Sequence, residues 1–343
     1  MRHYVLLFLL FLLSFVLVYF LYRSSNYYDK KFNFNRVYKK TAVHDFTVVK
    51  LEDNITGFAG IGVGNLYFFT AHLGVLIRYD FSFKNRTTIS LPVHAEWDRK
   101  VGDQFYAVVN YPVVYFCAYG IGTVFHYNVL DSSFSILRED SLGYSKFVAI
   151  DSMSFVFRRF NAKEKDQSFL YWNTKSDLLY DNHFYFPIHH DGGISTEGKL
   201  IYDKSRKKIV YVLVYQGYFF VFDSLMNTIQ SFKTVDSIGD VSIHVSDKDG
   251  IYTSSSPSKR INSMAAAYNG KIYINSFLMS KVDNPKSFSD SAVIDVYDES
   301  LGIYQYSFYL PRVDKKKIEY LYIVDGYLAC YYPHAVVLCR LSY

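Results

Sequence analysis

One short stretch of the sequence contains residues that commonly bind metal ions: His189, His190 and Asp191, followed by two glycines. Imidazole nitrogens and carboxylate oxygens are ligands of zinc and related metals. Neighbouring residues on an extended chain point to opposite sides, however, so the two histidines are poorly placed to share one ion. We therefore expect a polar loop between strands, with metal binding as the alternative.

A second stretch, Asp247-Lys248-Asp249-Gly250, has the pattern of half a calcium-binding loop. It places carboxylates at alternate positions and ends in a glycine that allows a turn. Ile251 stands where another oxygen ligand is needed, and no glutamate completes the set. We expect a surface turn here, with calcium binding as the alternative.

Other familiar motifs for catalysis and cofactor binding are incomplete or absent. Gly60, Gly62 and Gly64 alternate as in a dinucleotide-binding loop, but no helix-forming stretch follows them. The G-x-S-x-G sequence that carries the nucleophile of many hydrolases does not occur. We therefore expect no catalytic residue and no bound cofactor.

Three cysteines are the remaining reactive groups. Cys330 and Cys339 flank the sequence YYPHAVVL. A turn centred on His334 and Ala335 would place them opposite each other on paired strands, where a disulfide can form if the separation suits it. We expect buried free thiols on β-strands, with the disulfide as the alternative. Cys117 has no evident partner.

The elements that must position these residues follow from an internal repeat. Segments 66–80 and 114–128 align without a gap, and each consists of a strand-like run, a glycine turn and a second strand-like run. Segment 208–223 is a third copy, in which Gly217 and Asp223 keep the spacing of Gly74 and Asp80. Weaker copies follow towards the C-terminus, so the whole main domain is built from one repeated unit.

Each copy is preceded by one short apolar stretch and usually followed by another, which gives four strands per unit. Four-stranded units with a period of about 40–50 residues are typical of β-propeller blades. The fold class is therefore all-β, a six-bladed β-propeller, with blades near 57–91, 101–137, 145–187, 193–235, 262–311 and 317–343. Blades packed face to face also explain the 34 tyrosines and 30 phenylalanines, because strands buried on both faces need large β-forming side chains.

The last unit has only three strands, while the strand-like run 42–51 precedes the first blade. We expect this run to supply the missing outer strand, so that 41–343 forms one ring without free sheet edges. The chain resembles six-bladed propellers of the NHL and TolB-like group in its repeat length, in its spacing from glycine to aspartate, and in the N-terminal strand that is expected to complete the last blade. Segment 202–237 is similar to uncharacterised bacterial membrane-anchored propellers. This resemblance implies the fold but supplies no catalytic residues.

The N-terminus predicts a membrane anchor. Residues 5–22 are almost uninterruptedly apolar and long enough for a transmembrane helix. Phe20, Leu21 and Tyr22 stand where signal cleavage needs small residues, so we expect an uncleaved signal-anchor after a tail of residues 1–4. Residues 23–40 would form a basic juxtamembrane linker that contacts lipid. Counting positive charges favours a cytoplasmic main domain, but the short tail is typical of a signal-anchor, and we expect the propeller in the bacterial periplasm.

The charge distribution limits the functions to consider. The net charge is +5; residues before 41 contribute +6, and the remainder of the chain, with 30 basic and 31 acidic residues, contributes −1. We therefore expect no nucleic-acid binding. The favoured function is a non-enzymatic module that binds a protein, peptide or glycan. The alternative is a metal-dependent hydrolase or lactonase with a cation held in the axial channel by residues such as Asp151, Asp203, Asp295 or Asp325.

Overall fold

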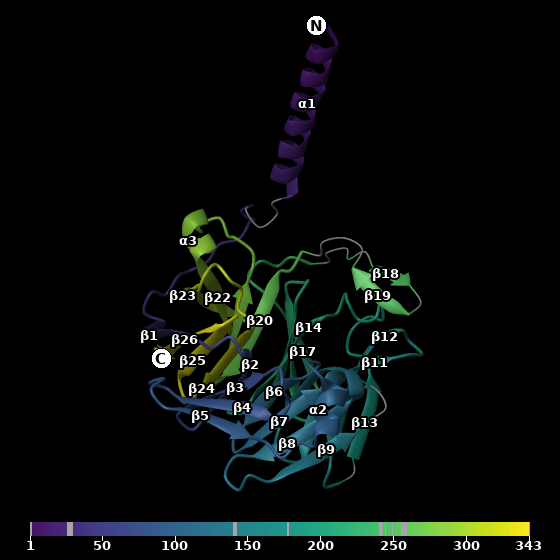
Figure 1. Ribbon diagram of the computed structural model, residues 1–343, viewed down its shortest axis with the longest axis vertical. Helices are drawn as coiled ribbons and strands as arrows, with labels where there is room; N and C mark the ends of the chain where they lie inside the picture. Colours follow the sequence, from purple (N-terminus) through teal and green to yellow (C-terminus); the bar gives the residue numbers. More distant parts are fainter. Residues whose placement is uncertain are drawn as a thin grey trace.

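The computed structural model shows a six-bladed β-propeller with a separate N-terminal helix, which confirms the predicted fold class (Figure 1). The structure describes residues 2–25, 30–139, 143–176, 178–239, 243, 245–248, 250–254 and 259–342. Within these residues, six antiparallel four-stranded sheets form the blades. Consecutive blades approach each other most closely at their inner strands, as in other propellers.

The strands of each blade follow one another along the chain. Blade 1 contains β2 (Ile55–Gly62), β3 (Asn65–Thr70), β4 (Val75–Asp80) and β5 (Arg86–Ser90). Blade 2 contains β6 (Tyr106–Asn110), β7 (Val113–Ala118), β8 (Thr123–Asn128) and β9 (Phe134–Glu139). Blade 3 contains β10 (Tyr144–Ala149), β11 (Ser154–Asn161), β12 (Asp166–Asn173) and β13 (Leu178–His183). The repeat noted in the sequence therefore corresponds to the second and third strands of each blade.

The second half of the ring has two insertions, a short helix within blade 5 and a hairpin between blades 4 and 5. Blade 4 contains β14 (Gly198–Asp203), β15 (Lys208–Leu213), β16 (Tyr218–Asp223) and β17 (Ile229–Lys233). Blade 5 contains β20 (Asn262–Tyr268), β21 (Lys271–Ser276), β22 (Ser291–Asp298) and β23 (Tyr304–Pro311), with the short helix α3 (Pro285–Asp290) before β22. A hairpin of β18 (Val245–Lys248) and β19 (Ile251–Ser254) lies between blades 4 and 5, and helix α2 (Ala95–Val101) lies between blades 1 and 2.

Blade 6 combines both ends of the propeller. It contains β24 (Tyr320–Val324), β25 (Tyr327–Tyr332), β26 (Ala335–Leu341) and, as its outer strand, β1 (Val43–Lys50). Strand β1 runs antiparallel to β26, from the Val43–Leu341 pair to the Lys50–Ala335 pair. The last sheet thus takes its fourth strand from the start of the domain, and this pairing joins the two ends of the ring.

Aromatic side chains fill the spaces between neighbouring blades. Tyr115 of blade 2 lies 5.5 Å from Phe147 and 5.6 Å from Phe155, both of blade 3. Phe169 of blade 3 meets Tyr211 of blade 4 edge to face at 5.3 Å. Each such ring removes roughly 150–250 Å² from water. Blade packing therefore accounts for much of the aromatic content.

The expected geometry of the C-terminal cysteines is wrong by one position. The turn between β25 and β26 is centred on Pro333 and His334, because Tyr332 pairs with Ala335. Cys330 consequently faces Val337, while Cys339 faces Leu328. The two thiols are buried and free. The predicted opposition of Cys330 and Cys339, and with it the disulfide, is therefore not present in the fold.

The N-terminal part consists of a helix and a docked segment. Helix α1 (Arg2–Ser25) is exposed over residues 3–21, and its stretch His3–Leu21 is long and apolar enough to cross a membrane. After it, Lys31 forms a parallel bridge with Met279, and Tyr38 forms one with Ser307. Within the predicted basic juxtamembrane linker 23–40, this part of the segment therefore lies against blade 5.

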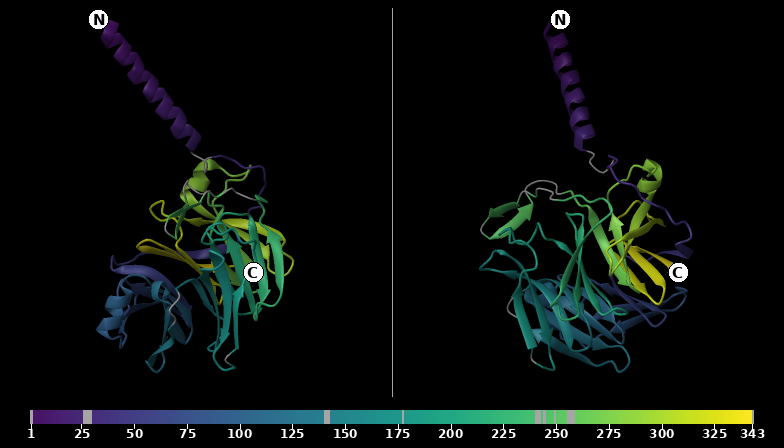
Figure 2. Two further views of the ribbon diagram at one scale, coloured as in Figure 1. Left: turned by 90° about the vertical axis from the view of Figure 1, so that its right-hand side faces the viewer. Right: turned by 180° about the vertical axis from the view of Figure 1, so that it is seen from behind.

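The order of the strands gives the ring two distinct faces. Because successive strands alternate in direction, connections between blades lie on the same face as the loops between second and third strands. This face carries α2, α3 and the β18–β19 hairpin, and it receives Lys31 beside Met279 (Figure 2). We call it the anchor face. The turns after the first and third strands form the opposite face.

Candidate ligand-binding cleft

A polar cleft of about 300 Å³ lies on the anchor face, beside the β18–β19 hairpin. One side is formed by the connection from blade 3 to blade 4, and the other by the excursion between blades 4 and 5. The cleft brings together most of the sequence-predicted polar residues although they are distant in sequence. Its lining residues are His189, His190, Asp191, Ser195, Ile243, Val245, Asp247 and Tyr252.

Asp191 organises the loop on the first side. Its Oδ1 accepts hydrogen bonds from the backbone N–H of Gly193 (2.8 Å) and Ile194 (3.1 Å), and its Oδ2 accepts one from Ser195 (2.9 Å). Its side chain is nearly buried. Both oxygens are thus occupied by main-chain donors, which is the usual way that an aspartate stabilises a tight loop.

The two histidines are held apart by different contacts. The backbone N–H of His189 donates to Oδ2 of the buried Asp166 at 2.7 Å. The Nδ1 atom of His190 lies 2.6 Å from the carbonyl oxygen of Glu164. Because a carbonyl can only accept, Nδ1 of His190 carries the proton, and Nε2 is the acceptor in the neutral ring. His190 also has a φ of 55°, so the backbone turns between the two rings.

The hairpin is fixed to this loop through Tyr252. A Cβ atom at Gly192, which has a φ of 73°, would lie 2.7 Å from the Tyr252 ring, so only glycine permits this contact. Lys165 Nζ approaches Asp247 Oδ2 at 3.7 Å and links the hairpin to blade 3. Desolvation together with the nearby Asp247 carboxylate raises the pKa of the Tyr252 hydroxyl.

A buried arginine supports the floor of the cleft. Arg158 Nη2 donates to the Gly193 carbonyl and to Thr196 Oγ1, both at 2.9 Å. Glu197 lies between Lys146 at 2.7 Å and Arg158 at 3.4 Å. Burial alone would raise the pKa of Glu197, but these two cations lower it. The loop from Asp191 to Glu197 is therefore anchored from below as well as from within.

The hydrogen bonds of the candidate metal ligands show which local structure each side chain stabilises. Asp247 accepts a hydrogen bond from the Gly250 backbone N–H at 3.0 Å within the hairpin, and Asp249 lies outside the described residues. Asp247 and Gly250 thus belong to the β18–β19 hairpin. Across the described ranges, no group of three or more His, Cys, Asp or Glu side chains is arranged to hold a metal ion.

The four aspartates named for an axial cation site do not form a metal-binding group within the described residues. Asp151 accepts hydrogen bonds from Met153 and Ser154 in its own turn, both at 2.7 Å. Asp203 likewise binds its own turn. Asp325 occupies a turn with a φ of 51°.

Asp295 lies on β22, the third strand of blade 5, and binds Arg36 with a 2.8 Å ion pair. It therefore cannot join the others at the axis. Tyrosines line part of the inner strands instead, with Tyr106 on β6 and Tyr320 and Tyr322 on β24, all half-buried.

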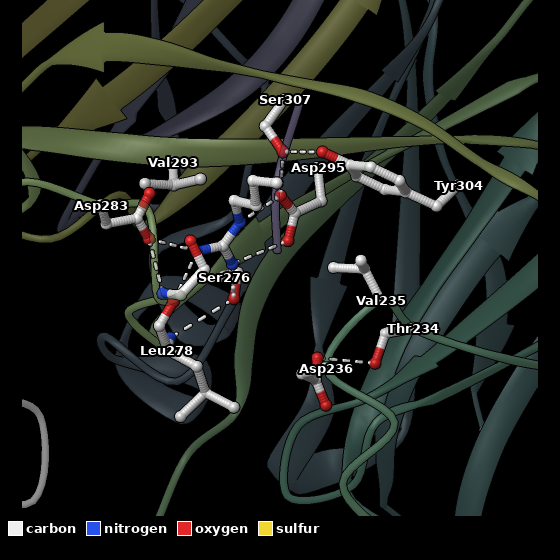
Figure 3. Close-up of polar contacts among 12 residues, drawn as sticks. Thr234, Val235, Asp236, Ser276, Leu278, Asp283, Val293, Asp295, Tyr304 and Ser307 are labelled. Carbon is white, nitrogen blue, oxygen red and sulfur yellow. Dashed lines mark hydrogen bonds and ion pairs between the residues drawn. The ribbon is translucent and has the colours of Figure 1, made fainter. Parts of the chain in front are cut away.

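The network around Arg36 was missed in the sequence, where this residue counted as part of a basic linker. All five N–H groups of the buried guanidinium have acceptors. They donate to Asp295 Oδ1 (2.8 Å) and Oδ2 (3.0 Å), Asp283 Oδ2 (2.8 Å), Ser276 Oγ (2.8 Å) and the Leu278 carbonyl (2.7 Å) (Figure 3). Tyr38 also donates to Asp283 and stacks on Tyr309 at 4.4 Å.

Tyr252, Ile243 and Val245 in the cleft were also not identified from the sequence. One signal was available, because residues 236–261 were left unassigned between two predicted blades. A connection of that length within a compact domain often carries function. The sequence contains no direct indication that this excursion folds back on the His189–Asp191 loop.

Comparison with known proteins supports the fold alone. No family model matches the chain, and no curated protein matches it. A solved member of the DUF4221 family from Bacteroides vulgatus has a TM-score of 0.53 and 10% identity, covering 89% of this chain and 99% of that one. A streptogramin B lyase has a TM-score of 0.52 and 9% identity, covering 89% and 100%. A putative exported protein from Bacteroides fragilis has a TM-score of 0.50 and 10% identity, covering 91% and 99%.

At these identities the similarity describes architecture rather than activity. All three solved chains are covered almost completely, so the shared part is the whole ring. The chain is thus a six-bladed β-propeller that carries an N-terminal apolar helix able to cross a membrane.

Proposed function

We propose that this protein is a membrane-tethered binding module that recognises a protein, peptide or glycan outside the cytoplasm, without catalysing a reaction. The polar cleft on the anchor face is the proposed ligand site. Helix α1 supplies the tether. The similar exported protein of Bacteroides fragilis supports a location beyond the cytoplasm, in the periplasm.

The observation that carries this proposal is the way the cleft uses its ionisable groups. Asp191 is saturated by main-chain N–H groups, and Nδ1 of His190 donates to a backbone carbonyl. A catalytic acid or base must be able to exchange a proton with substrate. Asp191 is fixed by its main-chain contacts, while His190 presents Nε2 as a hydrogen-bond acceptor, so the loop gives a rigid polar surface, and the adjoining Tyr252 ring adds a flat apolar contact.

The size and chemistry of the cleft define the ligand. A volume of about 300 Å³ is at the small end of ligand sites. It accommodates a sugar unit or one or two amino-acid residues of a longer chain. The mixture of imidazole, hydroxyl and carboxylate groups suits a polar ligand that offers several hydrogen bonds. A glycan or a peptide end meets both conditions.

The test uses the purified full chain in detergent against an array of defined oligosaccharides and peptides. His189→Ala removes a side chain without touching the His189 backbone contact, and Tyr252→Phe keeps the ring that packs on Gly192. We expect His189→Ala to lower the affinity for an array compound about tenfold, which corresponds to about 1.4 kcal/mol of binding free energy. Leu301→Ala, on the opposite face, is the matched control and should bind normally.

Two results would contradict the proposal. If array compounds bind both cleft variants with wild-type affinity, the ligand site lies elsewhere. If a bound compound is converted to product, the protein is an enzyme. A folded protein that binds nothing on the array would exclude the oligosaccharide and peptide classes represented there.

A further inference from the structure

We infer that the anchor face of blades 5 and 6 is itself a membrane-contact surface, which binds anionic lipid headgroups. This inference rests on the membrane-tethering part of the proposed function. It adds a second attachment, made by the folded propeller rather than by the helix. It also fixes which face of the ring is turned towards the bilayer.

Chain length keeps this surface close to the membrane. Helix α1 ends at Ser25, and Lys31 is already bridged to Met279 in the loop between β21 and β22. Six residues of fully extended chain reach about 20 Å at most. The backbone N–H of Phe32 also donates to the Met279 carbonyl at 2.8 Å, so the segment is fixed to the loop at this point. The surrounding residues are therefore held within reach of the headgroups.

Exposed lysines gather around this point, and we call them the lysine sector. Its members come from the docked segment, the α3 loop and the connection between blades 5 and 6: Lys30, Lys31, Lys281, Lys286, Lys315 and Lys317. Direct contacts join the three segments. Lys31 Nζ donates to the Lys281 carbonyl at 3.0 Å, Arg312 N–H donates to the Asp290 carbonyl at 3.2 Å, and Lys317 lies 5.1 Å from the Phe277 ring centre.

The positive charge of the sector is only partly balanced. Asp283, in the α3 loop, is turned inwards and paired with Arg36 at 2.8 Å; because Arg36 also pairs with Asp295, this buried cluster offsets one of the neighbouring lysines. Three other carboxylates belong to these segments: Asp290, Asp314 and Glu319. Val282, beside Lys281, is 56% exposed and can enter the boundary between headgroups and acyl chains. Lysines next to an exposed apolar residue are typical of an interfacial contact.

The opposite face carries charges of both signs, because Lys84, Lys204, Arg206 and Lys207 are exposed in its turns. Its turns begin with the aspartates of the repeated unit, including Asp80, Asp151, Asp203, Asp223 and Asp298. These aspartates cap their own turns, so the repeat places carboxylates at this end of successive blades. A negative lipid surface attracts the lysine sector, whereas the aspartates in the opposite turns offset the attraction of the cations beside them. Charge and chain connection therefore select the same orientation.

The experiment measures lysine accessibility in the full chain. The protein is placed in nanodiscs of phosphatidylcholine alone or mixed with phosphatidylglycerol, labelled with an amine-reactive acetyl ester, and read by peptide mass spectrometry. We expect Lys281, Lys286 and Lys315 to react about fivefold more slowly in the anionic discs, since each lysine near such a surface gains about 1 kcal/mol. Lys84 and Lys204, exposed on the opposite face, are the controls and should react equally in both.

Further arms separate the possible outcomes. Salt at about 1 M shortens the Debye length to about 3 Å and should remove the protection. Equal labelling of the sector in both discs would overturn the inference while leaving ligand binding in the cleft intact. If soluble glycerol phosphate protects the same lysines in neutral discs, the sector binds free anions, and the inference of a lipid-contact surface is overturned as well. A chain that does not remain with the discs would overturn both the tether and this surface.

Discussion

Replacing Arg36 by alanine tests whether the docked N-terminal segment is an integral part of the propeller. The substitution removes all five donated hydrogen bonds and leaves Asp283 and Asp295 buried without their counter-charge. Although burial by itself lowers the pKa of the Arg36 guanidinium, the adjacent Asp295 and Asp283 carboxylates outweigh it and raise that pKa. The charged form of Arg36 is thus strongly favoured in the fold.

The expected magnitude follows from the uncompensated charge. Breaking a buried ion pair by removing one partner costs about 3–5 kcal/mol, mostly because the remaining charge is stranded. Two carboxylates are stranded here, so we expect a loss at the upper end of this range. At roughly 2 °C per kcal/mol for a domain of this size, the Tm should fall by roughly 10 °C.

The assay is thermal unfolding of the full chain in detergent, followed by near-ultraviolet circular dichroism. Lys40→Ala is the matched control, because Lys40 belongs to the same segment but is exposed, and it should change the Tm very little. Adding Asp283→Asn and Asp295→Asn to Arg36→Ala should restore part of the loss, since the buried charges are then absent. An Arg36→Ala melt within about 1 °C of wild type would refute the reasoning, because a buried pair of this kind cannot be removed without cost.

Three further predictions concern closure, pH and orientation. Deleting residues 41–52 removes β1, so the chain should become insoluble or unfolded, and a normal cooperative melt of the truncated chain would contradict ring closure by β1. Burial, with Asp203 nearby, raises the pKa of Glu299 to about 7, above the reference value of 4.5. The folded state therefore binds more protons than the unfolded state between these values, and stability should decrease as pH rises from 4.5 to 7. Glu299→Gln should remove that dependence and raise the Tm at pH 8; an unchanged pH profile of the Tm would disprove this assignment. A phosphatase fused after Tyr343 should be active outside the cytoplasm, and activity of only a cytoplasmic reporter at that position would reverse the proposed topology.

The architecture was predictable because it rests on local repetition. The alignment of 66–80 with 114–128 identifies the second and third strands of each blade, and four strands per period indicate a propeller. Antiparallel hairpins with short turns need no information beyond their own segment. The aromatic content then follows, since residues such as Tyr115 and Phe169 fill the spaces between blades.

The functional details depended on contacts between segments far apart in sequence. Arg36 lies about 250 residues from Asp283 and Asp295 along the chain, where the hydrogen bonds span 247 and 259 residues. Nothing in its local sequence distinguishes this buried arginine from the exposed lysines around it. The sequence supplies the charge of Arg36. Only the folded ring places two buried carboxylates beside that charge, and these ion pairs fix the N-terminal segment to blade 5.

The same division applies to the cleft and to the cysteines. The sequence by itself determined that His189, His190 and Asp191 lie in a polar loop between blades. Only the tertiary structure placed Tyr252 against Gly192 and so closed the second side of the cleft. A one-position difference in the β25–β26 turn separated Cys330 from Cys339. Register and long-range packing are set by side-chain fit across the whole ring, and a local pattern does not contain that information.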